Sequence, residues 1–228
     1  MTSINWSPID LVIFDVDGTL YSQRALRLHI IRDLLLYSVV RLDRSLIRIL
    51  SAYRRIREEL GDAEVVDFEP VLIERTAMAT QYTQLAVRAA VDEWIERRPL
   101  PYLRRCRYPG VAELFAGLRR QGKIIGVLSD YPARAKVGAL GLTADVIIAA
   151  GDHNVLRLKP APRGLEVILA ATGIRPEAAL MIGDRVERDG CAAARVGMAS
   201  LIRASHPITG WQTFRRFNDP VFTSLLGT

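Results

Sequence analysis

Residues 11–19 of the 228-residue chain read LVIFDVDGT, and the fold class can be inferred from this segment outward. Its first four residues form a continuous apolar run, which is typical of a strand buried in a parallel sheet. Asp15 and Asp17 follow the run directly, and Gly18 follows them. Because ligands of open α/β sheets bind beyond the carboxyl ends of the strands, these polar residues are expected at a ligand site.

Four further apolar runs continue this pattern, and helical periodicity separates them. The runs cover 124–128, 146–149, 179–182 and 199–202, and the expected helices cover roughly 110–121, 132–140, 162–172 and 187–196. Alternating strands and helices with right-handed crossovers predict an α/β fold with a doubly wound, Rossmann-like parallel sheet.

Nearly a hundred residues separate the first run from the second, and most of them read as helix. We therefore expect a discontinuous sheet domain, 1–21 and 108–228, that carries a helical insert over 22–107. The expected insert helices are one ending near Arg41, one from an N-cap at Asp43 to Gly61, and one from Pro70 to about Arg98, with Pro99 and Pro101 marking the return.

The net charge of +6 is concentrated in the first half of the insert, because the window 22–57 holds nine arginines and only two acidic residues. The chain has 28 arginines and three lysines, which indicates a compositional bias rather than a nucleic-acid surface. No nucleic-acid partner is expected. The segment 26–50 has 15 apolar residues in 25. It reads either as packed helices or as a partly exposed face for dimerisation or an anionic membrane surface.

The two cysteines, Cys106 and Cys191, are too few and too far apart for a disulfide framework or a CxxC site. We expect reduced thiols and a cytoplasmic protein. The N-terminus shows no leader pattern, and no apolar run approaches the ~18 residues that a membrane helix needs.

Three more polar motifs follow the later strands. Ser129 comes after the second run, Lys159 precedes a proline, and residues 183–189 read GDRVERD, which places Asp184 and Asp189 after the fourth run. A cluster of ionised carboxylates costs free energy unless a nearby cation offsets the repulsion between the charges. Mg²⁺, which takes carboxylates together with substrate phosphate, is the natural candidate.

The order DxDGT, Ser, Lys-Pro and GDxxxxD resembles the haloacid dehalogenase superfamily of hydrolases, in the branch with a helical cap inserted after the first motif. The resemblance implies a sheet of strand order 5-4-1-2-3, so that the motifs after the first and fourth strands lie side by side. It also implies a Mg²⁺-dependent phosphatase that acts on a small phosphorylated metabolite through an aspartyl-phosphate.

The same resemblance assigns a role to each motif residue. Asp15 would be the nucleophile, and Asp17 the general acid and base whose backbone carbonyl also ligates Mg²⁺. Ser129, Lys159 and Gly18 would bind the phosphate. The Mg²⁺ site would comprise Asp15, Asp17 and Asp184, with Asp189 as a more distant or water-mediated partner. Dehalogenases of the superfamily lack the acid at the position of Asp17, so its presence favours phosphoryl transfer.

Two alternatives stay open at this point. A phosphomutase of the same superfamily shares all four motifs, and a non-catalytic protein could keep the fold and bind an anionic membrane or polyanion through 22–57. Arg24 and Arg27 are the candidates for substrate selectivity, because they follow the first motif and begin nearest the catalytic edge. The substrate and the oligomeric state are not defined by the sequence.

Overall fold

The predicted strands assemble into one parallel sheet in the computed structural model, which describes the backbone of residues 4–41 and 45–226 and the side chains of these residues outside 36–41. The sheet order is β3-β2-β1-β4-β5-β6. The strands are β1 Leu11–Phe14, β2 Ile124–Ser129, β3 Val146–Ala149, β4 Ala179–Gly183, β5 Ala199–Arg203 and β6 Thr213–Phe214. The expected order of the first five strands is confirmed, and the short parallel strand β6, which was not predicted, extends the sheet beyond β5.

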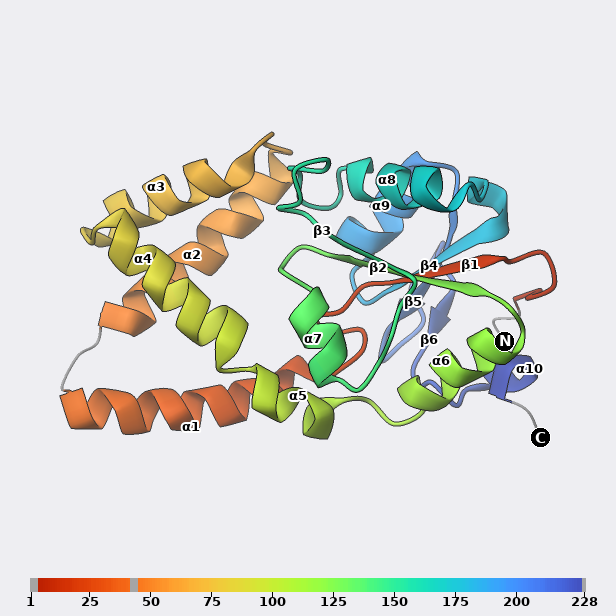
Figure 1. Cartoon of the computed structure of the whole chain (residues 1–228), viewed down its shortest axis with the longest axis horizontal. Helices are drawn as coiled ribbons and strands as arrows, with labels where there is room; N and C mark the ends of the chain where they lie inside the picture. Colours follow the sequence, from red (N-terminus) through yellow and green to blue (C-terminus); the bar gives the residue numbers. More distant parts are fainter. Residues whose placement is uncertain (1–3, 42–44, 227–228) are drawn as a thin grey trace.

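Helices cover both faces of the sheet. Val12 and Phe14 of β1 belong to the core cluster that contains the apolar side of α6, whereas Leu11 and Ile13 belong to the cluster with α8 and α9. This split follows from the alternation of side chains along a strand. Figure 1 shows α8 and α9 on one face and α6 with α10 on the other. The bounds are α6 Val111–Arg120, α8 Arg163–Thr172, α9 Cys191–Arg195 and α10 Thr223–Leu226.

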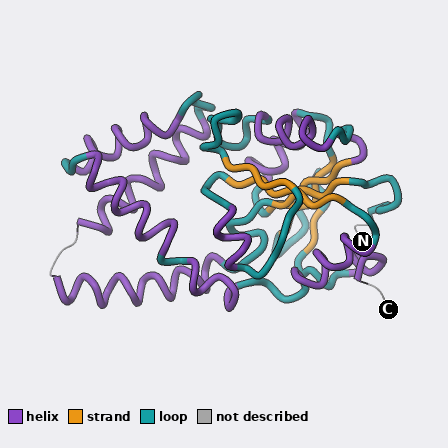
Figure 2. The backbone as a smooth tube through the Cα atoms, viewed as in Figure 1, coloured by secondary structure: helices purple, strands orange, loops and turns teal. Residues whose placement is uncertain are grey.

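The residues between β1 and α6 are mainly helical and lie beside the sheet rather than over its faces (Figure 2). The helices here are α1 Gln23–Arg41, α2 Ser45–Asp62, α3 Phe68–Thr80, α4 Gln84–Val91, a π-helical turn Asp92–Arg97, and α5 Leu100–Cys106. The segments on either side of the predicted boundaries are hydrogen-bonded to each other, since Ser22 N donates to Cys106 O and Tyr108 N donates to Leu20 O.

The expected single helix over 70–98 is wrong. Gln81 adopts a left-handed conformation with φ 61°, and Thr83 caps a new helix by accepting a hydrogen bond from Ala86 N at 3.2 Å. Pro99 and Pro101 do not mark an extended return either, because they lie in the first turn of α5, where a missing N–H costs nothing. The expected N-cap at Asp43 lies outside the described residues.

The apolar segment 26–50 is divided between the core and the surface. Leu26, Ile30, Ile49 and Leu50 are buried, and large exposed side chains share the same two helices: Leu28, Ile31, Leu35 and Ile47. No helix in the described part of the chain is both long enough and apolar enough to cross a membrane.

The topology places the motif loops together. Because β1 lies between β2 and β4, the loops that follow these three strands meet at the carboxyl edge of the sheet. Helix α7, Arg134–Ala139, follows the β2 loop and packs against α5.

Candidate active site

Asp15 lies at the end of β1 and is almost completely buried. One carboxylate oxygen accepts a hydrogen bond from Lys159 Nζ at 2.6 Å, and the other accepts one from Thr19 Oγ1 at 2.8 Å. Burial and the nearby carboxylates of Asp189 and Asp184 raise the pKa of Asp15 well above its usual range, although Lys159 opposes the shift. The carboxylate is therefore fixed in place in surroundings that favour an additional positive charge.

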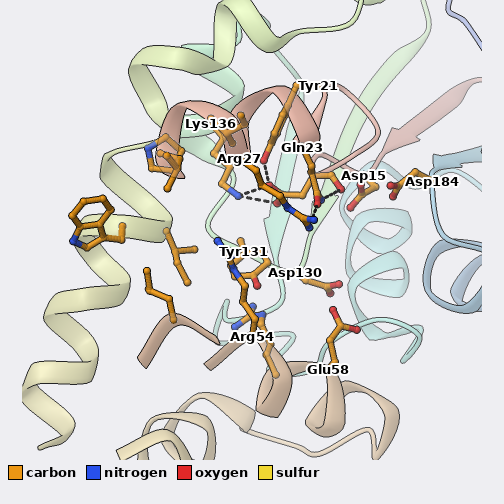
Figure 3. A pocket seen from close by; sticks show the side chains of 18 of the residues that line it. Asp15, Tyr21, Gln23, Arg27, Arg54, Glu58, Asp130, Tyr131, Lys136 and Asp184 are labelled. Atoms are coloured by element: carbon orange, nitrogen blue, oxygen red, sulfur yellow. Dashed lines mark hydrogen bonds and ion pairs between the residues drawn. The ribbon is translucent and has the colours of Figure 1, made fainter. Parts of the chain in front are cut away.

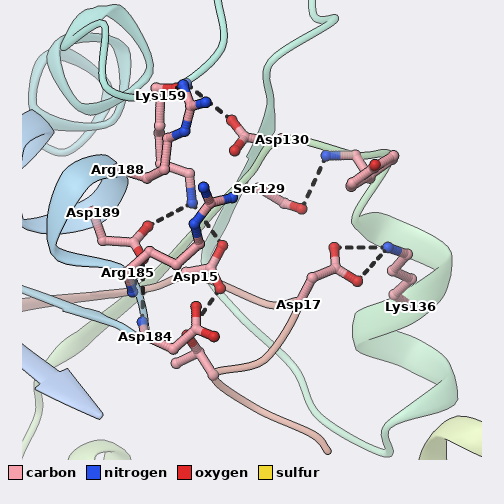
Figure 4. Close-up of polar contacts among 12 residues, drawn as sticks. Asp15, Asp17, Ser129, Asp130, Lys136, Lys159, Asp184, Arg185, Arg188 and Asp189 are labelled. Atoms are coloured by element: carbon pink, nitrogen blue, oxygen red, sulfur yellow. Dashed lines mark hydrogen bonds and ion pairs between the residues drawn. The ribbon is translucent and has the colours of Figure 1, made fainter. Parts of the chain in front are cut away.

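Lys159 joins two acidic residues from different loops (Figure 4). Its Nζ also lies 2.7 Å from Asp189 Oδ1, and the second oxygen of Asp189 accepts hydrogen bonds from the backbone N–H groups of Asp184 and Arg185, both at 3.1 Å. Burial alone would favour a neutral lysine, but Asp15 and Asp189 outweigh it and raise the pKa of Lys159. Asp189 thus holds both the lysine and the 184–185 backbone.

Asp17 is held by a different lysine. Lys136 of α7 donates to both carboxylate oxygens, at 2.7 and 2.8 Å, and the Tyr21 hydroxyl donates to the same carboxylate. Burial would raise the pKa of Asp17, but Lys136 and Tyr21 together lower it below its usual value. The Asp17 backbone carbonyl accepts a hydrogen bond from Gln23 Nε2 at 2.6 Å, which leaves one lone pair for a cation.

Gly18 and Ser129 lie at the same edge of the sheet as these carboxylates. Gly18 has φ 102°, and a Cβ at this position would lie 2.1 Å from Asp184 Oδ2, so only glycine allows the close approach. Ser129 is fully buried at the end of β2, and its Oγ accepts a hydrogen bond from Tyr131 N at 3.2 Å. Its hydroxyl proton is therefore available to another acceptor.

Three carboxylates could hold a metal ion. Asp15, Asp184 and Asp189 each offer one oxygen, and these three oxygens lie within 4.8 Å of one another. Burial and the charge of Asp189 raise the pKa of Asp184 to about 6. Crowded oxygen ligands whose charges repel one another suit a hard divalent cation such as Mg²⁺, and the space kept by Gly18 beside Asp184 fits the same interpretation.

A cavity of about 590 Å³ opens from these residues toward the helical segment. Arg27 lines it from α1, and Arg54 and Glu58 line it from α2 (Figure 3). Arg24 is exposed and is not among the lining residues, although both Arg24 and Arg27 were predicted as selectivity residues. Much of the remaining wall is apolar, and its apolar residues are Leu26, Ile30, Ile31, Leu34, Ile47, Leu50, Trp94, Ile95, Pro99 and Leu158.

Helix α2 is tied to the loop after β4. Arg185 donates to both carboxylate oxygens of Glu58, at 2.9 and 3.0 Å. The buried Arg188 donates to Glu58 Oε2 at 2.9 Å, to Asp62 Oδ1 at 2.7 Å and to the carbonyl oxygen of Lys159 at 2.7 Å. These contacts connect the α2 wall of the cavity directly to the residues around Asp15.

Several site residues were not found from the sequence, above all Lys136, Tyr131 and Arg57. Lys136 did carry a signal, because lysine is rare in a chain with 28 arginines. Tyr131 and Arg57 carried none, since they line the cavity through the packing of α2 against the β2 loop, which depends on the tertiary fold.

Comparison with known proteins finds two phosphatases that are similar to this chain. The phosphoglycolate phosphatase of Rhodospirillum rubrum is 34% identical to this chain over 80 residues. The matched segment covers 34% of this chain and 33% of that protein. Phosphoglycolate phosphatase 1 of Pseudomonas aeruginosa is 26% identical over 196 residues, covering 82% of this chain and 66% of that protein. The chain thus spans a third of one relative and just under two thirds of the other.

Solved structures share the fold. The putative HAD-hydrolase YfnB from Bacillus subtilis, bound to magnesium, has a TM-score of 0.66 at 14% identity, covering 91% of this chain and 95% of that one. CbbY from Rhodobacter sphaeroides, in complex with phosphate, has a TM-score of 0.61 at 22% identity, covering 92% and 96%. The family model for haloacid dehalogenase-like hydrolases matches residues 9–197. The chain therefore belongs to the haloacid dehalogenase-like hydrolase family.

Proposed function

We propose that this chain is a Mg²⁺-dependent phosphatase that hydrolyses a small phosphomonoester through an aspartyl-phosphate on Asp15, with residues 22–107 as a cap over the site. The main support for the proposal is the buried Asp15 carboxylate, which accepts hydrogen bonds from Lys159 and Thr19. Two further carboxylates lie beside it at the carboxyl edge of the sheet. A fixed carboxylate next to a buried cation is suited to attack on a phosphoryl group.

The proposed reaction has two steps. In the first, a carboxylate oxygen of Asp15 attacks phosphorus, the bond to the leaving alcohol oxygen breaks, and Asp17 transfers its proton to that oxygen. In the second, Asp17 takes a proton from water, which attacks phosphorus and releases inorganic phosphate and the Asp15 carboxylate. The ion pair with Lys136 stabilises ionised Asp17, and this makes its protonated form a stronger acid for the first transfer.

Asp15 and Asp184, with the backbone carbonyl of Asp17, are the groups that would hold Mg²⁺, and Asp189 would support them through the 184–185 backbone. The cation supplies positive charge that offsets the phosphoryl oxygens and the crowded carboxylates. Lys159 supplies a second positive charge beside Asp15, and Ser129 Oγ supplies a hydrogen-bond donor at the end of β2.

The choice of phosphoryl transfer over dehalogenation rests on Asp17. The fold alone does not separate the two reactions, because a 2-haloacid dehalogenase from Pseudomonas syringae has a TM-score of 0.63 at 20% identity. A dehalogenase needs no proton donor beside its nucleophile, whereas this chain holds Asp17 there with two side-chain donors. The two relatives named phosphoglycolate phosphatases support the same choice.

The test is a screen of phosphorylated metabolites with Mg²⁺, in which released inorganic phosphate is measured. Asp15→Asn serves as the blank, and Asp10→Asn, an exposed aspartate just before β1, serves as the matched control. Phosphate release by the wild type and by Asp10→Asn, but not by Asp15→Asn, is the expected result. Conversion of a sugar monophosphate into its isomer, with no phosphate released, would identify a phosphomutase instead. No reaction with any ester would contradict the proposal.

A further inference from the structure

Arg57 of α2 is a buried cation that lines the cavity next to the proposed catalytic site. Its exposed fraction is 5%. The guanidinium group stays charged in proteins, and a charge removed from water costs free energy unless a partner of opposite charge offsets it. The partners of Arg57 therefore decide what the residue is suited to bind.

The other buried cations of the described residues all have carboxylate partners. Lys136 pairs with Asp17, Lys159 pairs with Asp15 and Asp189, and Arg188 pairs with Glu58 and Asp62. Among the side chains that the structure describes, none places a carboxylate oxygen within 4.0 Å of the Arg57 guanidinium. One guanidinium nitrogen of Arg57 donates to the Tyr53 hydroxyl at 3.2 Å, and its buried Nε has no hydrogen-bond partner among the described residues.

Aromatic rings hold the Arg57 guanidinium in position. Its central carbon lies 4.1 Å from the ring centre of Tyr131 and 4.9 Å from that of Phe68. Contact with aromatic faces offsets part of the desolvation cost but leaves the in-plane N–H groups free for an anion. Tyr131 also connects Arg57 to the phosphate end of the cavity, because its backbone N–H donates to Ser129 Oγ.

The acidic groups around Arg57 do not neutralise it by contact. Asp130 and Glu69 act on it electrostatically, but the structure of the described residues shows no ion pair with either. Asp130 is engaged elsewhere, since its Oδ1 accepts a hydrogen bond from Lys159 N at 3.0 Å. The exposed Arg54, one helical turn earlier on α2, lines the same cavity and adds positive charge at this side.

We propose that Arg57 is a specificity-determining residue that binds a second anionic group, carried by the leaving group of the phosphomonoester. The inference rests on the proposed phosphatase function and names its substrate class: phosphomonoesters that also bear a carboxylate or a second phosphate. A planar guanidinium with free N–H groups matches the paired oxygens of either anion. The cavity of about 590 Å³ has room for such a leaving group beside the phosphate site.

The experiment compares pairs of esters that differ in this second anionic group. One pair is phosphoglycolate and its neutral amide, which tests a carboxylate, and the second pair is a hexose bisphosphate and the hexose monophosphate, which tests a second phosphate. Each is measured with wild type, Arg57→Met and Arg55→Met. Arg55 is the matched control, because it lies on α2, is exposed, pairs with Glu59 at 2.6 Å and is not among the lining residues.

We expect the wild type and Arg55→Met to prefer the anionic member of at least one pair. Arg57→Met should lose about tenfold or more in kcat/KM for that ester, with little change for the neutral member or for p-nitrophenyl phosphate. The pair that shows the preference identifies the anion. Equal losses on charged and neutral esters, or wild-type activity without any preference, would overturn the role of Arg57.

Binding separates this inference from the proposed function. Calorimetric titration of the Asp15→Asn protein with the charged and neutral esters, with and without Arg57→Met, measures the same preference without turnover. If this binding preference depends on Arg57 while the wild-type protein releases no phosphate from any ester, the anion site is upheld and the phosphatase is rejected. Binding without preference would reject the anion site. If Arg57→Met fails to fold, Arg57→Lys is used, because it keeps the charge and loses only the planar fork, and a reduced preference is expected.

Discussion

Lys136 Nζ lies 2.7 and 2.8 Å from the two carboxylate oxygens of Asp17, and this ion pair joins α7 to the loop after β1. The lysine side chain is 5% exposed and that of the aspartate 17%. Lys136 on α7 thus stabilises the ionised form of Asp17, the proposed acid in the loop after β1. The same lysine lies 4.9 Å from the ring centre of Tyr131, the ring that also packs on Arg57.

Replacement of Lys136 by methionine is expected to lower the free energy of unfolding by about 3 kcal/mol, because it leaves a buried carboxylate without its cation. Urea denaturation measures the change. The double variant Lys136→Met with Asp17→Asn should recover part of the loss, since no buried charge remains. A single variant as stable as the wild type would show that the pair contributes nothing to the fold.

Much of the sheet could be predicted because its strands are continuous apolar runs, as in LVIF before Asp15. The carboxyl ends of such strands meet at one edge, so Asp15, Lys159 and Asp184 could be brought together without coordinates. The cap was harder. The break at Gln81 depends on a left-handed residue and a threonine cap at Thr83, which are weak signals within a helical pattern.

The cavity-lining residues could not be predicted, because they depend on how α2 packs against the β2 loop. The rarity of lysine was the signal in the sequence that could have pointed to Lys136. All three lysines are in specific contacts: Lys123 Nζ donates to the Trp6 and Ile9 carbonyls, and Lys136 and Lys159 each pair with buried acids. In a chain so rich in arginine, each lysine marks a place that takes a compact ammonium group.

Gly18→Ala tests the close packing beside Asp184. The added Cβ would lie 2.1 Å from Asp184 Oδ2, and φ 102° strains any residue other than glycine. We expect activity to be lost and stability to fall by more than about 1 kcal/mol. Gly122→Ala is the matched control, because Gly122 also has a positive φ of 70° but has open space around its Cβ position. A Gly18→Ala enzyme as active as Gly122→Ala would show that Asp184 does not need its present position.

Asp184→Asn tests the metal site through stability rather than turnover. In the metal-free protein, burial and Asp189 raise the pKa of Asp184 to about 6, so its charge at pH 8 destabilises the fold. The amide should raise the free energy of unfolding by on the order of 2 kcal/mol in EDTA.

The same variant should lose the rise in Tm that Mg²⁺ gives the wild type, because a ligand that binds only the folded state stabilises it. Glu187→Gln removes an exposed carboxylate of the same loop, one that pairs with Arg185 at 2.9 Å, and should retain the Mg²⁺ effect. An unchanged Mg²⁺ effect in Asp184→Asn would place the metal elsewhere.

Arg27 and Arg24, both on α1, form a natural pair for testing this wall of the cavity. Arg27 lines the cavity and donates to Gln23 Oε1 at 3.0 Å, whereas Arg24 is exposed and is not among the lining residues. Arg27→Ala is expected to raise KM for an anionic substrate severalfold, and Arg24→Ala should leave it unchanged. Equal effects of the two substitutions would indicate a general loss of positive charge rather than a contact.

The proposed mechanism depends on a phosphoryl group bound covalently to Asp15. Enzyme that is turning over its substrate with Mg²⁺ is quenched in acid, reduced with borohydride, digested and sequenced by mass spectrometry, with Asp15→Asn treated in parallel. An acyl phosphate at residue 15 is reduced to homoserine, so we expect homoserine at this position in the wild type and none in the variant. Steady phosphate release with unmodified Asp15, or modification at another carboxylate, would contradict it.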